Sequence, residues 1–189
     1  MNVDEAILQR RTHKFFGGGP IADTCLRELL ELAIWAPNHG LTEPWRFSVV
    51  SGGRLGALQE CLDAAFGAMD KGGDGAELLA LKRRKMGRRI AGAGAVIAVS
   101  YRHTPDRPVT DREDYAAAAC AVQNILLGAT ARGLVGLWST GKVMGHPKVR
   151  AFLQQGDDEG QVGVLFLGTP AQAAVPRRSQ TIAALSRWI

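Results

Sequence analysis

A short basic segment near the N-terminus carries groups that bind phosphate well. It holds Arg10, Arg11, Thr12 and Lys14 within five positions. Two guanidinium groups, an ammonium group and a hydroxyl can neutralise a phosphate dianion through charge-assisted hydrogen bonds. If the segment is helical, Arg10 and Lys14 share one face. The alternative is structural, because basic residues at a helix C-terminus are stabilised by the helix dipole without any ligand.

A polar loop between two tryptophans is the second candidate. Trp35 precedes Ala36-Pro37-Asn38-His39-Gly40, and Pro44-Trp45 closes the loop. Indole rings beside an amide and an imidazole suit a flat heteroaromatic ligand. Two alternatives stay open: both tryptophans are core residues, and His39 is an ordinary hydrogen-bonded surface histidine.

The third candidate is the end of an apolar run, Gly136-Leu137-Trp138-Ser139-Thr140-Gly141. A strand that ends in hydroxyls and glycines lets backbone N–H groups approach a ligand closely. A plain strand-to-turn transition explains the same pattern. Ser139 lacks the GxSxG setting of a hydrolase nucleophile, so we expect no catalytic triad.

Several kinds of site are disfavoured by what the sequence lacks. The four histidines are scattered without metal-ligand spacing, so we expect no metal. The three cysteines form no CxxC pair, which favours structural thiols. Neither GxGxxG nor GxxxxGK[ST] occurs, which disfavours a dinucleotide held by a classical βαβ loop.

The charge favours anionic partners without identifying one. The formal net charge is +5 and the sequence pI is about 9.4, with a basic block over residues 82–89. We interpret this block as a solvated helix face, with phosphate attraction second and nucleic-acid binding last, because no aromatic residues interleave with the cations. No apolar run is long enough for a spanning helix, and the acidic N-terminus is unlike a signal peptide, so we expect a cytoplasmic protein without membrane contact.

The elements that position these groups are helices with a few strands between them. The 189 residues, 46% of them hydrophobic, are enough for one domain with a packed core. Asp23 is a plausible N-cap for the second helix. Periodicity predicts helices over residues 3–11, 23–36, 55–68, 77–90, 114–132 and 147–154, and strands over residues 45–51, 95–101, 134–139 and 162–167. The class is α+β or α/β.

Taken in order along the chain, the motifs resemble the flavin-dependent nitroreductase family. The resemblance covers nearly the whole chain and is closest to the compact bacterial subgroup of NAD(P)H nitroreductases. It rests on Arg10-Arg11-Thr12, Ala36-Pro37-Asn38-His39, Pro44-Trp45-Arg46-Phe47, Gln123-Asn124, Gly136 to Gly141 and Leu167-Gly168-Thr169-Pro170.

This resemblance implies a fold and an activity. The fold is an α+β three-layer sandwich, a single domain over residues 1–189 with a mostly antiparallel central sheet flanked by helices, and it forms an intertwined homodimer. FMN binds at the dimer interface, and NADH or NADPH passes a hydride through it to a nitroaromatic, a quinone or a similar small oxidant in ping-pong kinetics. The chemistry belongs to the cofactor, so no catalytic acid or base is expected.

The resemblance also implies roles for individual residues. In one subunit the FMN contacts are Arg10, Arg11, Thr12, Lys14, Trp138, Ser139 and Thr140. Trp35 and His39 reach the flavin from the other subunit. The nicotinamide nucleotide is associated with Gly128, Ala129, Thr130, Ala131, Arg132 and Gly133.

The chain departs from the family pattern at a few positions. Thr12 replaces the usual Ser and keeps the hydroxyl. Glu43 stands where Gln is common, so its carboxylate either points away from the flavin or lowers the flavin's potential, and Trp35 replaces a smaller or cationic residue. The family's C-terminal phosphate contact has only Arg177 and Arg178 as candidates.

Two other classes of function stay open. One is a flavin-binding sensor or storage protein without turnover, and the other is a nucleic-acid-binding module that uses residues 82–89. Within the enzyme hypothesis, the same basic block is a candidate for contacting the 2′-phosphate of NADPH.

Overall fold

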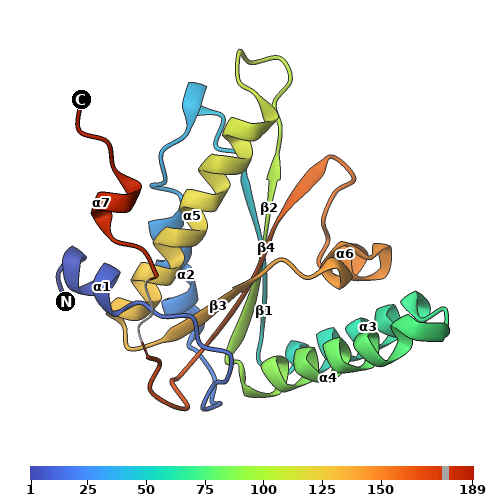
Figure 1. The fold of residues 1–189 in the computed structure, drawn as a ribbon. Helices are drawn as coiled ribbons and strands as arrows, with labels where there is room; N and C mark the ends of the chain where they lie inside the picture. Colours follow the sequence, from blue (N-terminus) through green and yellow to red (C-terminus); the bar gives the residue numbers. More distant parts are fainter. Residues whose placement is uncertain (176–178) are drawn as a thin grey trace.

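The computed structural model describes residues 1–175 and 179–189 and shows one four-stranded sheet between two layers of helices (Figure 1). Arg177 and Arg178 therefore lie outside the described residues. The strands are β1 (Trp45–Ser51), β2 (Ala95–Arg102), β3 (Val135–Ser139) and β4 (Glu159–Gly168). Their order is β1-β2-β4-β3, and each neighbouring pair is antiparallel. The expected antiparallel α+β sandwich is confirmed.

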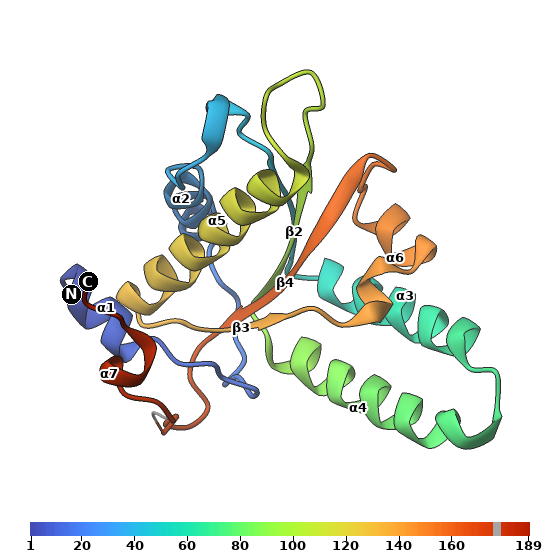
Figure 2. The ribbon, with the colours of Figure 1, turned by 45° about the horizontal axis from the view of Figure 1, so that its top comes forward.

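The helices divide between the two faces of the sheet (Figures 1 and 2). Helices α2 and α5 cover one face, with α1 and α7 at its outer edge, and α3, α4 and α6 lie on the other. The bounds are α1 (Val3–Gln9), α2 (Asp23–Ala33), α3 (Arg54–Met69), α4 (Ala76–Gly92), α5 (Asp111–Ala131), α6 (Pro147–Phe152) and α7 (Ile182–Leu185). Short 3₁₀ turns span His39–Leu41, Gly73–Gly75 and Lys142–Gly145.

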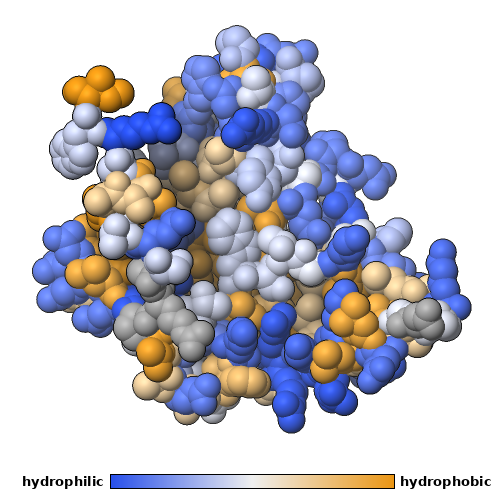
Figure 3. Space-filling view, in the orientation of Figure 1, coloured by the Kyte–Doolittle hydropathy of each residue, from blue (hydrophilic) through white to orange (hydrophobic). Residues whose placement is uncertain are grey.

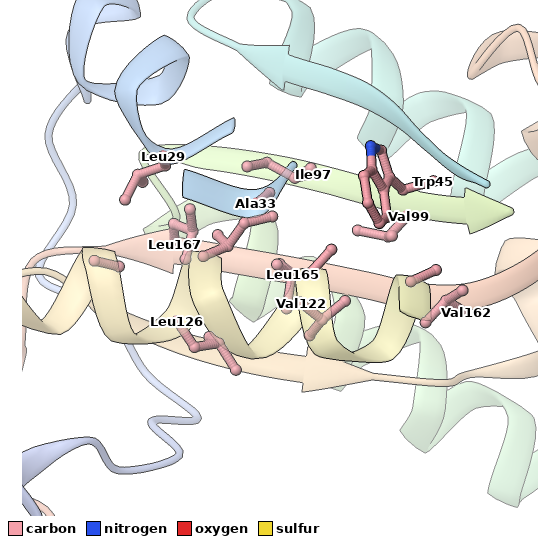
Figure 4. Packing of buried hydrophobic residues seen from close by; sticks show 14 of the residues in the cluster. Leu29, Ala33, Trp45, Ile97, Val99, Val122, Leu126, Val162, Leu165 and Leu167 are labelled. Atoms are coloured by element: carbon pink, nitrogen blue, oxygen red, sulfur yellow. The ribbon is translucent and has the colours of Figure 1, made fainter. Parts of the chain in front are cut away.

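Alternating side chains of the central strands build two separate cores. Ile97 and Val99 of β2 face α2 and α5, whereas Val96 and Ala98 face the opposite helical layer. This period of two is what a strand buried on both faces requires. Figure 4 shows the α2/α5 core, where the labelled side chains include Leu29, Ala33, Val122, Leu126, Leu165 and Leu167.

One extra residue in β4 breaks this alternation. Val99 pairs with Gly163, but the next residue, Ser100, pairs with Gln161, so Val162 is a bulge. As a result Val162 and Val164, two positions apart, belong to opposite cores. Bulges re-aim side chains and are frequent near functional sites, and this one lies beside Trp138.

Three local expectations are corrected. The first helix, expected over residues 3–11, ends at Gln9, and the chain then extends so that Thr12 forms a bridge with Gly136. Asp23 is not an N-cap, since Ala22 holds that position without a side-chain bond. Helix α5 begins at Asp111, three residues earlier than expected, behind a Thr110–Glu113 capping box.

Within the described part of the chain, no helix is both long and apolar enough to cross a membrane.

Candidate functional site

The N-terminal segment, α5 and the end of β3 enclose a surface cleft of about 420 Å³. This is a usual volume for a small-molecule site. Its lining combines one guanidinium, hydroxyl and amide groups and two aromatic rings. The lining residues are Arg10, Thr12, Tyr115, Gln123, Leu126, Gly136, Trp138 and Thr140.

A bridge between two distant segments assembles the cleft. Thr12 pairs in parallel with Gly136, and the backbone N–H of His13 donates to the Gly136 carbonyl at 3.1 Å. The N-terminal segment thereby becomes a short extension of the sheet beside β3. Because of this bridge, Arg10 and Thr12 line one cleft with Trp138 and Thr140, each 128 positions further along the chain.

The two neighbouring arginines have different surroundings. Arg10 lines the cleft, whereas the Arg11 guanidinium donates to the carbonyls of Leu8 at 2.5 Å and Arg10 at 2.8 Å. Arg11 thus satisfies carbonyls at the C-terminal end of α1, which matches the structural alternative for this segment. Burial lowers the pKa of the nearby His13 imidazole, which disfavours the charged form of that ring.

The bulge in β4 fixes Trp138. Its indole N–H donates to the carbonyl of Val162 at 3.3 Å, and the ring lies against Gly163. A Cβ atom on Gly163 would come within 2.3 Å of the indole nitrogen, and Gly163 has φ +150°, so only glycine fits. The indole is 37% exposed and forms part of the cleft wall.

Ser139, Thr140 and Gly141, which follow Trp138 in the third motif, line two cavities. Thr140 lines the cleft and also a second cavity of about 360 Å³ on the α3/α4 side, which Ser139 lines as well. The Ser139–Gly141 turn therefore lies between the two cavities. Lys14 lines neither: it borders a smaller hollow of about 150 Å³ together with Thr12, Phe15 and Gln172.

Trp35 and His39 of the polar loop after α2 do not line the cleft of their own chain. Trp35 is 83% exposed. His39 Nδ1 lies 2.9 Å from a carboxylate oxygen of Glu113 at the start of α5. Trp45 is buried in the α2/α5 core, which agrees with the alternative that it is a core residue. Glu43 is exposed, and its backbone N–H donates to Asn38 Oδ1 at 3.1 Å.

The 128–133 segment is the C-terminal turn of α5 and lines none of the described cavities. Gly128 is buried where a Cβ would lie 2.7 Å from Leu32 Cδ1, so its role in this chain is close packing of α5 against α2. Arg132 pairs with Glu28 of α2, with Nη2 2.9 Å from Oε2. The Thr130 hydroxyl donates to the Leu126 carbonyl within the helix.

Two cleft residues were missed from the sequence. Tyr115 and Leu126 line the cleft together with Gln123, and their spacing puts all three along one side of α5. The feature of the sequence that could have indicated them is Tyr115, a single tyrosine in an Ala-rich helix. The described residues contain no cluster of three potential metal ligands, and all three cysteines are free thiols.

A family model and a known relative each match most of the chain. The model of the Nitroreductase family matches residues 7–169. Bacillus subtilis YfhC, which bears the name "Putative NAD(P)H nitroreductase", is 30% identical over 169 residues, covering 89% of this chain and 84% of YfhC.

Two solved structures align with the whole fold. A nitroreductase-like protein of Bacillus cereus superposes with a TM-score of 0.83 at 27% identity, covering 100% of this chain and 96% of the other. A Desulfovibrio desulfuricans protein solved in complex with FMN superposes with a TM-score of 0.72 at 25% identity, covering 98% and 95%.

Proposed function

The chain belongs to the nitroreductase family, and from that premise we propose that it is an FMN-dependent oxidoreductase that uses NADH or NADPH to reduce a nitroaromatic, a quinone or a similar small oxidant. The observation that carries the proposal is the bridge of Thr12 to Gly136, which gathers Arg10, Thr12 and Trp138 around one cleft. The FMN-bound relative supports the cofactor.

The residues of the cleft fit FMN. A phosphate needs cations and hydroxyl donors, and Arg10 and Thr12 supply both at one end. A tricyclic ring needs apolar and aromatic walls, and Trp138, Tyr115 and Leu126 supply those. Arg11 uses Nη1 for its two carbonyl bonds, which leaves its Nε and Nη2 groups as the donors available to a phosphate. Lys14 lines a separate hollow in this structure.

When bound, FMN supplies the two-electron chemistry between nicotinamide and oxidant. The chain's own task is to hold the phosphate at Arg10 and Thr12, to keep the Trp138 indole fixed through Val162, and to present the Ser139–Thr140 backbone to the ring. None of these tasks needs a side-chain nucleophile or a general base.

We further propose that a second copy of the chain completes the site. Large apolar side chains are exposed along the α1/α7 edge and at the end of α2, and Figure 3 shows apolar surface on that side of the molecule. Trp35 at 83% and Trp188 at 92% exposure are the extreme cases. Burial against a partner would remove this surface from water and bring Trp35 and His39 to the partner's cleft.

The remaining part of the proposal concerns the nicotinamide nucleotide, for which Gly128 to Gly133 is the candidate segment. Arg132 is its exposed cation and is held by Glu28. Substituting Arg132 with Gln is expected to raise the KM for NADPH or NADH without changing the FMN content. An unchanged KM for both nucleotides would remove this segment from the site.

The central experiment measures FMN binding and its reduction. We expect purified protein to show flavin absorbance and to bleach when NADH or NADPH is added without oxygen. Arg10→Gln is expected to raise the Kd for FMN about 10- to 100-fold, since a hydrogen bond to a charged group is worth about 1.5–3 kcal/mol. Arg27→Gln, which removes an exposed arginine of α2 outside the cleft lining, is the matched control.

Distinct outcomes contradict distinct parts of the proposal. Equal FMN affinity in Arg10→Gln and Arg27→Gln would show that FMN does not bind in this cleft. A yellow protein that neither nucleotide bleaches would indicate a sensor or a storage protein. Full flavin content in a monomer that persists on dilution would contradict the two-subunit site.

A further inference from the structure

The second cavity has a lining unlike that of the cleft. It lies between α3, α4 and the turn after β3, and its volume is about 360 Å³. The apolar part of its lining includes Phe66, Met69, Met86 and Val143, and the two methionine side chains are flexible and polarisable. Methionine thioethers and a phenyl ring make favourable contacts with an aromatic ligand.

The rim of this cavity is strongly basic. Lys82, Lys85 and Arg89 are spaced by three and four residues, so they share one face of α4, and Lys142 faces them from the turn after β3. The lining includes no carboxylate. Among residues 1–175 and 179–189, these four cations have no ion pair or side-chain hydrogen bond.

Arg89 is the most informative of the four. Its side chain is half-buried, and burial lowers the pKa of its guanidinium. An arginine in a protein nevertheless stays protonated. The chain therefore holds a partly desolvated cation at a concave apolar surface without a counter-charge, which is unfavourable unless an anion binds there.

This cavity adjoins the proposed FMN cleft. Thr140 contributes to the lining of both, and Ser139 and Gly141 of the same turn line the basic cavity. A molecule in the basic cavity would therefore lie next to Thr140, which also lines the cleft. An electron acceptor has to come close to the cofactor, so a cavity that shares a wall residue with the cleft is a candidate acceptor site.

We propose that the basic cavity binds the electron acceptor, and that it selects acceptors with an anionic group, such as a carboxylate or sulfonate, on an aromatic body. The proposal rests on the proposed function and adds the substrate class. The aromatic body lies on Phe66, Met69 and Met86, and the anionic group faces Lys85 and Arg89.

The reaction of such an acceptor balances with the partners already named. With 4-nitrobenzoate, NADH or NADPH supplies a hydride and solvent supplies a proton. These two electrons and two protons break one N–O bond, so that the nitro group becomes nitroso, one oxygen leaves as water, and the nucleotide becomes NAD⁺ or NADP⁺.

The first test is binding, measured by calorimetry on the FMN-loaded protein with benzoate and its neutral isostere benzamide. We expect Lys85→Gln to weaken benzoate binding about five-fold, and the Lys85→Gln/Arg89→Gln double variant to weaken it further, with little change for benzamide. Arg84→Gln is the matched control, because Arg84 is on the same helix but borders a different hollow. Added salt should weaken benzoate binding and leave benzamide binding unchanged.

The second test is the ratio of kcat/KM for 4-nitrobenzoate to that for 4-nitrobenzamide. We expect the ratio to fall in Lys85→Gln and not in Arg84→Gln. The proposal is overturned if the ratio is the same in the native protein, Lys85→Gln and Arg84→Gln. It is also overturned if neither Lys85→Gln nor the Lys85→Gln/Arg89→Gln double variant changes the affinity for benzoate. If the variant instead loses discrimination between NADPH and NADH, the cavity holds the nucleotide's phosphate and the acceptor assignment is wrong.

These outcomes separate the two proposals. A protein that binds benzoate at the basic cavity but neither binds FMN nor oxidises nucleotide supports the anion site and contradicts the oxidoreductase. A protein that reduces 4-nitrobenzamide as well as 4-nitrobenzoate, with no effect of Lys85, supports the oxidoreductase and contradicts the anion site.

Discussion

The charged groups at the start of α5 and those along α4 are arranged in opposite ways. At α5 each carboxylate has partners: Asp114 accepts from the Thr42 hydroxyl at 2.6 Å and lies 2.7 Å from His103 Nδ1, and Glu113 lies 2.9 Å from His39 Nδ1. On α4 the cations around the basic cavity face one another and no carboxylate.

The difference separates charges that hold the chain from charges that are available to a ligand. The α5 carboxylates fasten the 38–44 loop, which carries His39, to a helix that packs on the sheet. The cations that line the basic cavity make no ion pair or side-chain hydrogen bond among the described residues, so their removal should leave the fold intact and change only what binds. Stability and binding measurements on matched variants therefore test this distinction.

The largest effect is expected at Asp114, whose side chain is only 1% exposed. Asp114→Ala removes the buried carboxylate that the Thr42 hydroxyl and the His103 ring share. We expect a loss of about 3 kcal/mol in the free energy of unfolding, measured by urea denaturation. Asp114→Asn, which keeps an acceptor, should lose less, and the exposed neighbour substitution Arg112→Ala should change stability by less than about 0.5 kcal/mol. A loss in Asp114→Ala no larger than in Arg112→Ala would show that the network does not hold the loop.

Glu113 makes the same region sensitive to acid. A hydrogen bond from the Thr110 backbone N–H, followed by those from His39 and the Thr110 hydroxyl, lowers the pKa of Glu113 to about 2. Because the folded pKa is lower than the unfolded value near 4.5, the ionised carboxylate stabilises the fold above about pH 4.5, and this contribution is lost as the pH falls toward 2.

The measurement is the difference in Tm between the native protein and Glu113→Gln. We expect a difference of a few degrees at pH 6 that shrinks steadily between pH 4.5 and pH 3. Glu77→Gln, an exposed glutamate in the first turn of α4, is a control for the general loss of a charge at a helix N-terminus. A Tm difference that is constant across this pH range would contradict the assigned cause.

The sequence predicted the layers and strands well, because these depend on local patterns. The apolar run at Ala95–Tyr101 and the motif around Trp45 each gave a strand in the correct place. The prediction places the start of α5 three residues late, although Thr110-x-x-Glu113 is a capping-box pattern, because the two prolines before it favour a loop up to Thr110.

The site was predicted in part, for a physical reason. Arg10, Thr12, Trp138 and Thr140 do line one cleft, but the bridge and the β4 bulge that position them are long-range pairings that no local pattern encodes. The turn of Arg11 back onto α1 depends on carbonyls left open at the helix end, which appear only when its last residue is known. The cofactor roles of all these residues stay predictions.

A smaller effect is expected at Arg83, an α4 cation outside the basic cavity that has an ion-pair partner. Arg83 Nε lies 2.5 Å from Asp63 Oδ1 of α3, and both side chains are partly exposed. Arg83→Gln should lower the free energy of unfolding by about 0.5 kcal/mol, and 1 M salt should reduce that loss. Asp63→Asn should give a similar loss, and the double variant should lose less than the sum of the two. Additive losses would show that the pair contributes no coupling.

The smallest effect is expected at the cavity rim itself. Lys85 has neighbouring cations at Lys82 and Arg89, so Lys85→Gln removes repulsion without breaking a contact. We expect the free energy of unfolding to stay within about 0.5 kcal/mol of the native value, or to rise slightly at low salt, as urea denaturation at two ionic strengths will show. A rise that disappears in high salt identifies like-charge repulsion as its cause. A loss of stability comparable to that of Arg83→Gln would mean that Lys85 has a structural partner, and the contrast between the α5 carboxylates and the α4 cations would no longer hold.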